Sequence, residues 1–215
     1  MAEGAPMAER GRAQLLAARP ARRQALAGAA AIALLALPPV RRAMEAGMAT
    51  HMLLQFPALI AAGALLASAC PASLRRRVAR WNVLGIAGLS ASASVLALAM
   101  IPRLLDLALV DARVEAAKWA ALLACGAALR LSWRPAGAVV QGFFLGNVLP
   151  MTGVVGVLYQ DATARLCNSY RLDEPAFVGQ ALVWMAIAAA AAWLLHAAAQ
   201  SICAERDGLR SRAGA

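Results

Sequence analysis

Residues 43–69 read AMEAGMATHMLLQFPALIAAGALLASA, and this stretch decides the class of protein. Its 27 residues include one charged side chain, that of Glu45. A helix that crosses the roughly 30 Å hydrocarbon core of a bilayer needs about 20 apolar residues. A helix is also the open-ended element that satisfies its own backbone hydrogen bonds in lipid. The stretch therefore predicts a membrane-spanning helix.

Similar apolar segments lie between clusters of arginine along the rest of the chain. We expect six spans, at about residues 25–40, 43–69, 81–101, 114–133, 138–159 and 176–199. The predicted fold is an all-α, polytopic integral membrane helix bundle over residues 21–200. A disordered basic arm (1–20) would precede it, and a cytoplasmic tail (201–215) would follow. A cleaved signal peptide is the alternative for the first apolar stretch, although the basic segment before it is long for one.

Composition supports a membrane protein and excludes several other classes. The 215 residues are 62% hydrophobic and 15% charged, whereas soluble domains average about 45–50% apolar and about 25% charged. Disordered chains are poor in hydrophobic residues. The net charge of +10 is carried by arginine, with Lys118 the single lysine. Nucleic-acid-binding domains show clustered lysine and aromatics on a polar background, so we expect the lipid bilayer as a partner and no nucleic acid.

The basic residues also predict the orientation. With both termini in the cytoplasm, fourteen of the 21 fall on the inner side, as the positive-inside rule requires. They are Arg10, Arg12, Arg19, Arg22, Arg23, Arg75, Arg76, Arg77, Arg80, Arg130, Arg134, Arg206, Arg210 and Arg212. The outer seven are Arg41, Arg42, Arg103, Arg113, Lys118, Arg165 and Arg171. We expect a multi-pass membrane protein.

Motifs for catalysis are missing from the sequence. There is no P-loop and no C-x-x-C pair, and no nucleophile and base share a predicted pocket, so we expect no enzyme. The acids of the apolar region lie near predicted span ends. A proton-coupled transporter would therefore have no obvious carboxylate inside the membrane to carry the proton. These acids are Glu45, Asp106, Asp111, Glu115, Asp161, Asp173 and Glu174.

One stripe of side chains suggests chemistry in the outer half of the bundle. Met44, Met48, His51 and Gln55 recur at i, i+4, i+7 and i+11, which is one face of a helix. Thioether and imidazole groups suit Cu(I). The candidate metal ligands are His51, Met48 and Met100, with Met44 and Met52 as further candidates. The alternative is that these methionines and the histidine only fill space in the packed helices.

Three motifs in this order resemble the CtaG-type cytochrome c oxidase assembly proteins. They are Met48-Ala-Thr-His51-Met-Leu-Leu, Ile101-Pro102-Arg-Leu-Leu-Asp106-Leu-Ala-Leu, and Leu172-Asp173-Glu174-Pro-Ala-Phe-Val-Gly179-Gln-Ala-Leu-Val-Trp184-Met185. The resemblance runs from about residue 44 to residue 193. It marks Pro57, Pro102, Asp106, Asp173, Glu174 and Gly179 as further motif positions.

The resemblance implies an assembly or accessory factor for a haem–copper oxidase in a bacterial inner membrane, with oxidase subunits or another membrane protein as partners. It also implies four copper-binding histidines, of which His51 alone is present. Gly47, Met100 and Lys118 stand at the other three positions, and Lys118 places a cation where a ligand would be. Either a reduced Met/His set handles Cu(I), or the scaffold has lost the metal. The alternatives are a small permease for a metal or solute, and a non-catalytic structural subunit of a respiratory complex.

Overall fold

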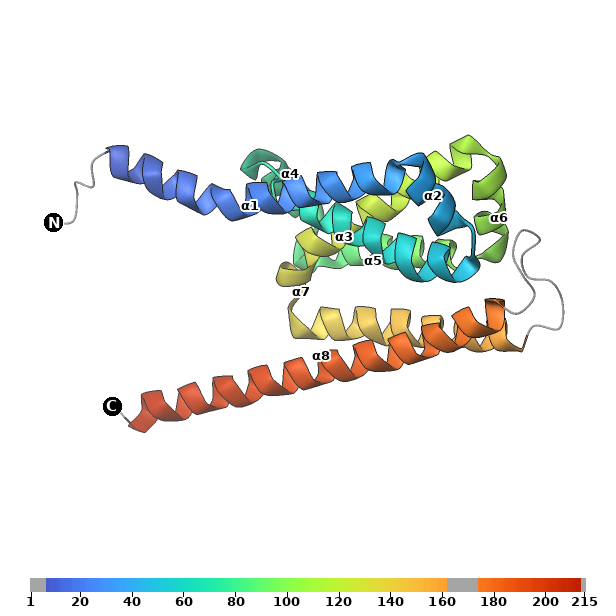
Figure 1. The fold of residues 1–215 in the computed structure, drawn as a ribbon. Helices are drawn as coiled ribbons and strands as arrows, with labels where there is room; N and C mark the ends of the chain where they lie inside the picture. Colours follow the sequence, from blue (N-terminus) through green and yellow to red (C-terminus); the bar gives the residue numbers. More distant parts are fainter. Residues whose placement is uncertain (1–6, 162–173, 214–215) are drawn as a thin grey trace.

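The computed structural model describes residues 7–161 and 174–213, and its regular elements there are all helices (Figure 1). The predicted all-α fold class is confirmed. In chain order the elements are α1 (Met7–Ala36), α2 (Pro38–Glu45), η1 (Thr50–Gln55), α3 (Phe56–Ala67), α4 (Ala72–Trp81), η2 (Val83–Gly85), α5 (Ile86–Ala99), α6 (Pro102–Val110), α7 (Ala112–Gln160) and α8 (Glu174–Ala213).

Three of the described helical stretches are long and apolar enough to cross a membrane: Thr50–Ala67, Ala112–Gln160 and Glu174–Ile202. Two bent pairs reach the same length when taken together. Pro20–Ala36 and Pro38–Glu45 meet at 75°, and Ala72–Trp81 and Val83–Ala99 meet at 71°. By length and composition, the described residues therefore hold three to five spans.

The first predicted span is bent where its sequence ends in two prolines. Leu37 is extended, and Pro38 opens α2, because proline lacks the N–H that a continuing helix requires but fits its first turn. Upstream, α1 already begins at Met7. Residues 7–20, which we expected in a disordered arm, are helical, since alanine, arginine, leucine and glutamine are all good helix formers.

The long helix α7 is broken at Gly137, whose backbone angles (φ 62°, ψ 175°) are not helical. This region of backbone space is open essentially to glycine alone. Figure 1 shows the chain reversing there, so that residues 112–136 and 138–160 form two arms running in opposite directions. The break falls between the predicted spans 114–133 and 138–159.

Two further helical segments lie where the sequence indicated connections. Residues 102–110 form the short helix α6, which Pro102 opens and which buries Leu105 and Ala108. At the other end of the chain, α8 continues to Ala213, through the expected tail. The short apolar run after Pro102 was too brief to predict as a span, and its burial comes from packing against the other helices.

The helices enclose two buried apolar clusters. The larger one includes Met52, Leu59, Leu105, Leu122 and Val178, so that it joins η1, α3, α6, α7 and α8. The smaller one includes Leu89, Ala136, Phe144 and Val148 of α5 and α7. Figure 1 places α2 and α6 at one end of the molecule, and α4, the start of α1 and the end of α8 at the other.

Candidate functional site

The candidate site is built on η1, a wide π-helical turn at the start of the span Thr50–Ala67. The Phe56 N–H bonds the carbonyl of His51, five residues back. Pro57 has no N–H to give to the preceding turn, which favours such a wide turn. Single π-helical turns inside longer helices occur often at functional sites. Here the turn buries the side chains of His51 and Gln55 completely.

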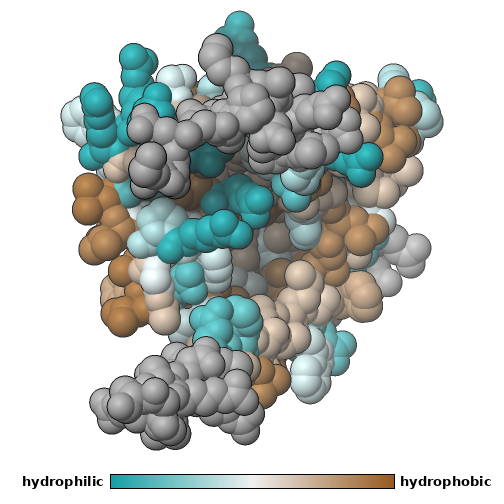
Figure 2. Space-filling view, turned by 90° about the vertical axis from the view of Figure 1, so that its left-hand side faces the viewer, coloured by the Kyte–Doolittle hydropathy of each residue, from teal (hydrophilic) through white to brown (hydrophobic). Residues whose placement is uncertain are grey.

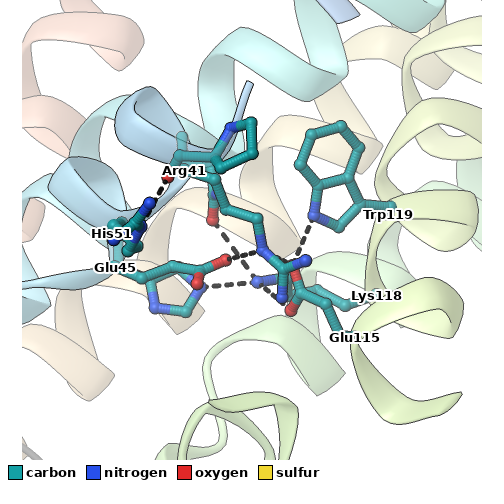
Figure 3. Close-up of polar contacts among 9 residues, drawn as sticks. Arg41, Glu45, His51, Glu115, Lys118 and Trp119 are labelled. Carbon is teal, nitrogen blue, oxygen red and sulfur yellow. Dashed lines mark hydrogen bonds and ion pairs between the residues drawn. The ribbon is translucent and has the colours of Figure 1, made fainter. Parts of the chain in front are cut away.

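The ammonium group of Lys118, on the first arm of α7, lies against this turn (Figure 3). Its Nζ lies 2.7 Å from His51 Nε2 and 3.3 Å from Gln55 Oε1. A third acceptor, Glu115 Oε2, lies 2.7 Å away on the same helix. The contacts with His51 and Gln55 are hydrogen bonds, and the contact with Glu115 is an ion pair. The Lys118 side chain therefore fills the space beside His51 Nε2.

Glu115 joins the buried lysine to charges nearer the surface. The Glu115 residue is 5% exposed, and its Oε1 accepts a hydrogen bond of 2.6 Å from the indole Nε1 of Trp119. The same oxygen lies 3.7 Å from Arg41 Nε, which donates to Glu45 Oε1 at 3.0 Å. Figure 3 shows these side chains converging from α2 and α7. Two cations face two carboxylates, the pairing that buried charges need.

Gln55 leaves one polar atom without a partner. Its Oε1 faces Lys118 Nζ, and its amide Nε2 is buried with no hydrogen-bond acceptor in the described part of the chain. An amide flip would turn a donor towards the ammonium, so the contact with Lys118 fixes the assignment. A buried, unpaired donor costs about 1–3 kcal/mol. The site is thus polar and almost fully paired.

The predicted methionine ligands divide between the core and the helix ends. Met48 and Met52 are buried in the larger apolar cluster, and Met44 packs against its edge from α2. A bend at residues 46–47 interrupts the predicted stripe, so Met44 belongs to a different helix. Met100 ends α5, and its carbonyl accepts the hydroxyl hydrogen bond of Tyr159.

Histidine, cysteine and carboxylate side chains do not gather into a metal-binding group of three or more anywhere in the described residues. Among the described residues, the charged group in contact with His51 is a cation, the ammonium of Lys118. Among the candidate ligands, the structure brings Met48, His51 and Met52 onto one short segment. Met100 is connected to this segment indirectly. Its carbonyl accepts a hydrogen bond from Tyr159, and Tyr159 packs in the same apolar cluster as Met48 and Met52.

The further motif positions lie mostly at helix starts and helix contacts. Pro57 and Pro102 occupy the first turns of α3 and α6. Glu174 Oε2 accepts the backbone N–H of Met48 at 2.7 Å, which ties the start of α8 to the segment before η1. Gly179 lies against the backbone of Gly156 on α7.

Two motif acids complete the set. Asp106 lies on α6, partly buried beside the larger cluster. Asp173 lies outside the described residues. The three motif segments are far apart in the sequence, yet Met48, Leu105 and Val178, one from each, meet in the same apolar cluster.

Sequence reasoning missed most of the polar site. It placed Glu115 and Glu45 among acids near the span ends and treated Lys118 as a charge that opposes a metal. The detectable signal was the spacing of Glu115 and Lys118, three residues apart at the start of an apolar run, because residues at i and i+3 face the same side of a helix. The 67-residue separation of Lys118 from His51 left their pairing invisible.

Comparison with protein-family models, with curated proteins and with solved structures finds no match to this chain.

Proposed function

We propose that the chain crosses a bacterial inner membrane six times, with both termini on the cytoplasmic side. The sixth crossing comes from counting the two arms of α7 separately, on either side of Gly137. The start of α1 and the end of α8 lie at the same end of the molecule (Figure 1), as an even number of spans requires. The excess of arginine at that end favours the cytoplasm.

Within that membrane we propose a non-enzymatic assembly or accessory factor for a haem–copper cytochrome c oxidase. The oxidase comes from the resemblance to the CtaG-type proteins. The observation that carries the proposal is the meeting of the three motif segments in one cluster around η1. Residues that carry a shared function are expected to converge in space even when they are distant in the sequence.

We further propose that this chain has kept the scaffold without a resident copper ion. The residues do not fit a Cu(I) site as they stand, because the Lys118 ammonium lies 2.7 Å from His51 Nε2. A metal ion at that nitrogen would have to displace a cation that is held by Glu115 at 2.7 Å. Met48 and Met52, the candidate thioethers nearest to His51 in the sequence, are both packed in the apolar cluster. The chain would then act by docking to a membrane partner.

Deletion of the gene in its bacterial host tests the assembly role. We expect a lower level of assembled oxidase, read from the haem spectrum of the membranes and the copper content of the purified enzyme. The wild-type gene and a Met48→Leu variant, which keeps the packing but removes the thioether, should both restore it. A full oxidase level in the deletion strain would contradict the assembly role.

Titration of the purified protein with Cu(I) separates the two forms of this proposal. We expect no stoichiometric binding. Binding of one equivalent that is lost in both His51→Ala and Met48→Leu would replace the metal-free form with a copper-handling one.

An ion-coupled permease is a second candidate, and the buried pair of Lys118 and Glu115 favours it. Ionisable residues inside a membrane often mark ion pathways, and Glu115 is buried where the sequence indicated only interfacial acids. Reconstitution in vesicles that contain a pH-sensitive dye tests it. Proton flux above that of empty vesicles, lost in Lys118→Met, would support the permease, whereas the docking role predicts no such flux.

A further inference from the structure

A second site lies at the end of the molecule opposite the candidate site, between the end of α3, α4, η2 and α7. A cavity of about 910 Å³ opens there, a size typical of small-molecule sites, which run about 300–1,000 Å³. Three arginines and several large apolar side chains line it, including Arg75, Arg130, Arg134, Leu129, Trp133 and Phe144. The cavity is therefore basic and apolar at once.

Buried polar contacts fix one wall of this cavity. Asn82 Nδ2 donates to Ser132 Oγ at 2.8 Å, and the Gly88 N–H donates to Asn82 Oδ1 at 2.9 Å. Gly85 has a left-handed conformation (φ 69°) and lies against the Ser132 carbonyl, too close for any larger residue. The preceding Leu84 also has a positive φ of 52°, which is strained for a side chain of this size. Strain held in place by such contacts is typical of binding sites.

Among the side chains that the structure describes, none is an acidic partner of these three arginines. The ion pairs of the described side chains all involve Arg41 or Lys118, and no acidic side chain in the described part lines the cavity. The guanidinium of Arg75 has a hydrogen bond of 3.2 Å to the Cys70 carbonyl. The planar guanidinium group matches the geometry of a phosphate oxygen pair. An anion that carries phosphate would complete this set of donors.

Apolar groups beside the arginines indicate what the phosphate is attached to. Leu129 and Phe144 line the cavity, and Trp81 and Val83 beside it are 84% and 66% exposed. A free inorganic phosphate would gain nothing from this apolar lining, whereas the acyl chains of a lipid would cover it. Basic pockets between membrane helices are known to bind phospholipid headgroups. Figure 2, which faces this end, shows hydrophilic side chains gathered over its centre and hydrophobic ones along its flanks.

We propose that this cavity binds an anionic phospholipid from the leaflet on the side of the termini. Arg75, Arg130 and Arg134 hold the phosphate, and Leu129 and Phe144 contact the upper part of an acyl chain. The α4 helix forms one wall of the site and meets the helical segment that follows it at an angle of 71°. This proposal is independent of the oxidase and of copper.

Native mass spectrometry of the full chain in neutral detergent tests the lipid. The probes are dioleoyl phosphatidylglycerol, dioleoyl phosphatidylcholine and inorganic phosphate. We expect the anionic lipid to bind at least tenfold more tightly than the neutral one, and inorganic phosphate at equal concentration not to displace it. Equal binding of the two lipids would overturn the proposal, and so would displacement by free phosphate.

Two matched triple variants separate the cavity from general charge. R75Q/R130Q/R134Q removes the three lining arginines and should weaken the anionic lipid at least tenfold. R76Q/R77Q/R80Q removes three exposed arginines of α4 that do not line the cavity, and it should stay within twofold of the wild type. Equal losses in both variants would overturn the proposal. If the first triple variant loses its helical circular dichroism, the single variants R130Q and R134Q should each weaken binding at least threefold.

Discussion

Lys118 is a cation at the start of an apolar run, and acceptors from two segments of the chain hold it. His51 and Gln55 come from η1, and Glu115 lies one turn away on α7. Breaking a buried ion pair by removing one partner costs about 3–5 kcal/mol, because an unpaired charge is left behind. Removing both partners together is often nearly neutral. A variant that removes one partner and a variant that removes both therefore distinguish a stabilising ion pair from two charged side chains that only lie close together.

We predict that Lys118→Met lowers the free energy of unfolding by about 3–5 kcal/mol, because the Glu115 carboxylate loses its ammonium. Denaturant titration of the purified protein in detergent measures it. The double variant E115Q/K118M removes both charges and should recover most of the loss. Additive losses in the double variant would mean that the two side chains do not act as a pair.

The residues of this site were only partly predictable. His51 and Gln55 follow from the helical stripe before Pro57, because their spacing places them on one face. Arg41 and Glu45, four residues apart, could have been paired by the same reasoning. Lys118 could not be placed beside His51, because that contact depends on how α7 packs against η1. A single sequence carries no local signal for such a contact.

At the scale of the elements, small residues set how closely the helices approach. A Cβ on Gly126 of α7 would overlap the Ile60 carbonyl of α3, and a Cβ on Gly63 would overlap the Leu123 carbonyl in return. Small residues at helix interfaces allow such backbone contact in membranes. The two glycines thus form a reciprocal contact between α3 and the first arm of α7.

Gly126→Ala should therefore separate these helices and lower the free energy of unfolding by about 1–3 kcal/mol, the usual cost of overpacking. Gly146→Ala, on the second arm of the same helix, is the control. No atom lies within 4 Å of its added Cβ, and alanine is a better helix former than glycine by about 1 kcal/mol. We expect unchanged or slightly higher stability for the control. Equal losses for the two variants would show that the contact with Ile60 is not the cause.

A charged side chain, Glu174, ties the start of α8 to the segment before η1. Glu174→Ala removes the acceptor of the Met48 N–H and should cost about 1.5–3 kcal/mol, the usual range for a hydrogen bond to a charged group. Protease sensitivity around residue 174 and thermal unfolding both measure it. Glu174→Gln keeps an acceptor oxygen and should lose less. An equal loss for glutamine would indicate that charge, and not the hydrogen bond, holds α8.

The helices themselves were more predictable than their breaks. Long apolar runs fix which segments become helices, because in lipid no other open element satisfies its backbone. The bend at Leu37 and the reversal at Gly137 follow from proline and glycine in the sequence. The helix α6 and the conformations of Leu84 and Gly85 do not, because they arise from packing against Ser132 and the apolar clusters.

For the whole molecule, the proposed six-span topology predicts which native cysteines are reached from outside. In cells of the bacterial host, an impermeant maleimide should label a variant that keeps only Cys167, which the topology places outside. A variant that keeps only Cys70 should be labelled only after the membrane is permeabilised, since Cys70 lies at the end that bears the termini in that topology. Labelling of Cys70 in intact cells would contradict the orientation.

The three contacts of Lys118 also have a consequence for the order in which the protein is made. A lysine that enters lipid without a partner carries an energetic cost, which reaches roughly 2.5–3.5 kcal/mol at the centre of a helix and is smaller towards its ends. Its acceptors His51 and Gln55 precede it by 67 and 63 residues, so they leave the ribosome first. In the proposed topology, the acceptors would therefore be in the membrane before the charge that needs them. The first arm of α7 would then enter the membrane next to the side chains of His51 and Gln55, which accept hydrogen bonds from Lys118.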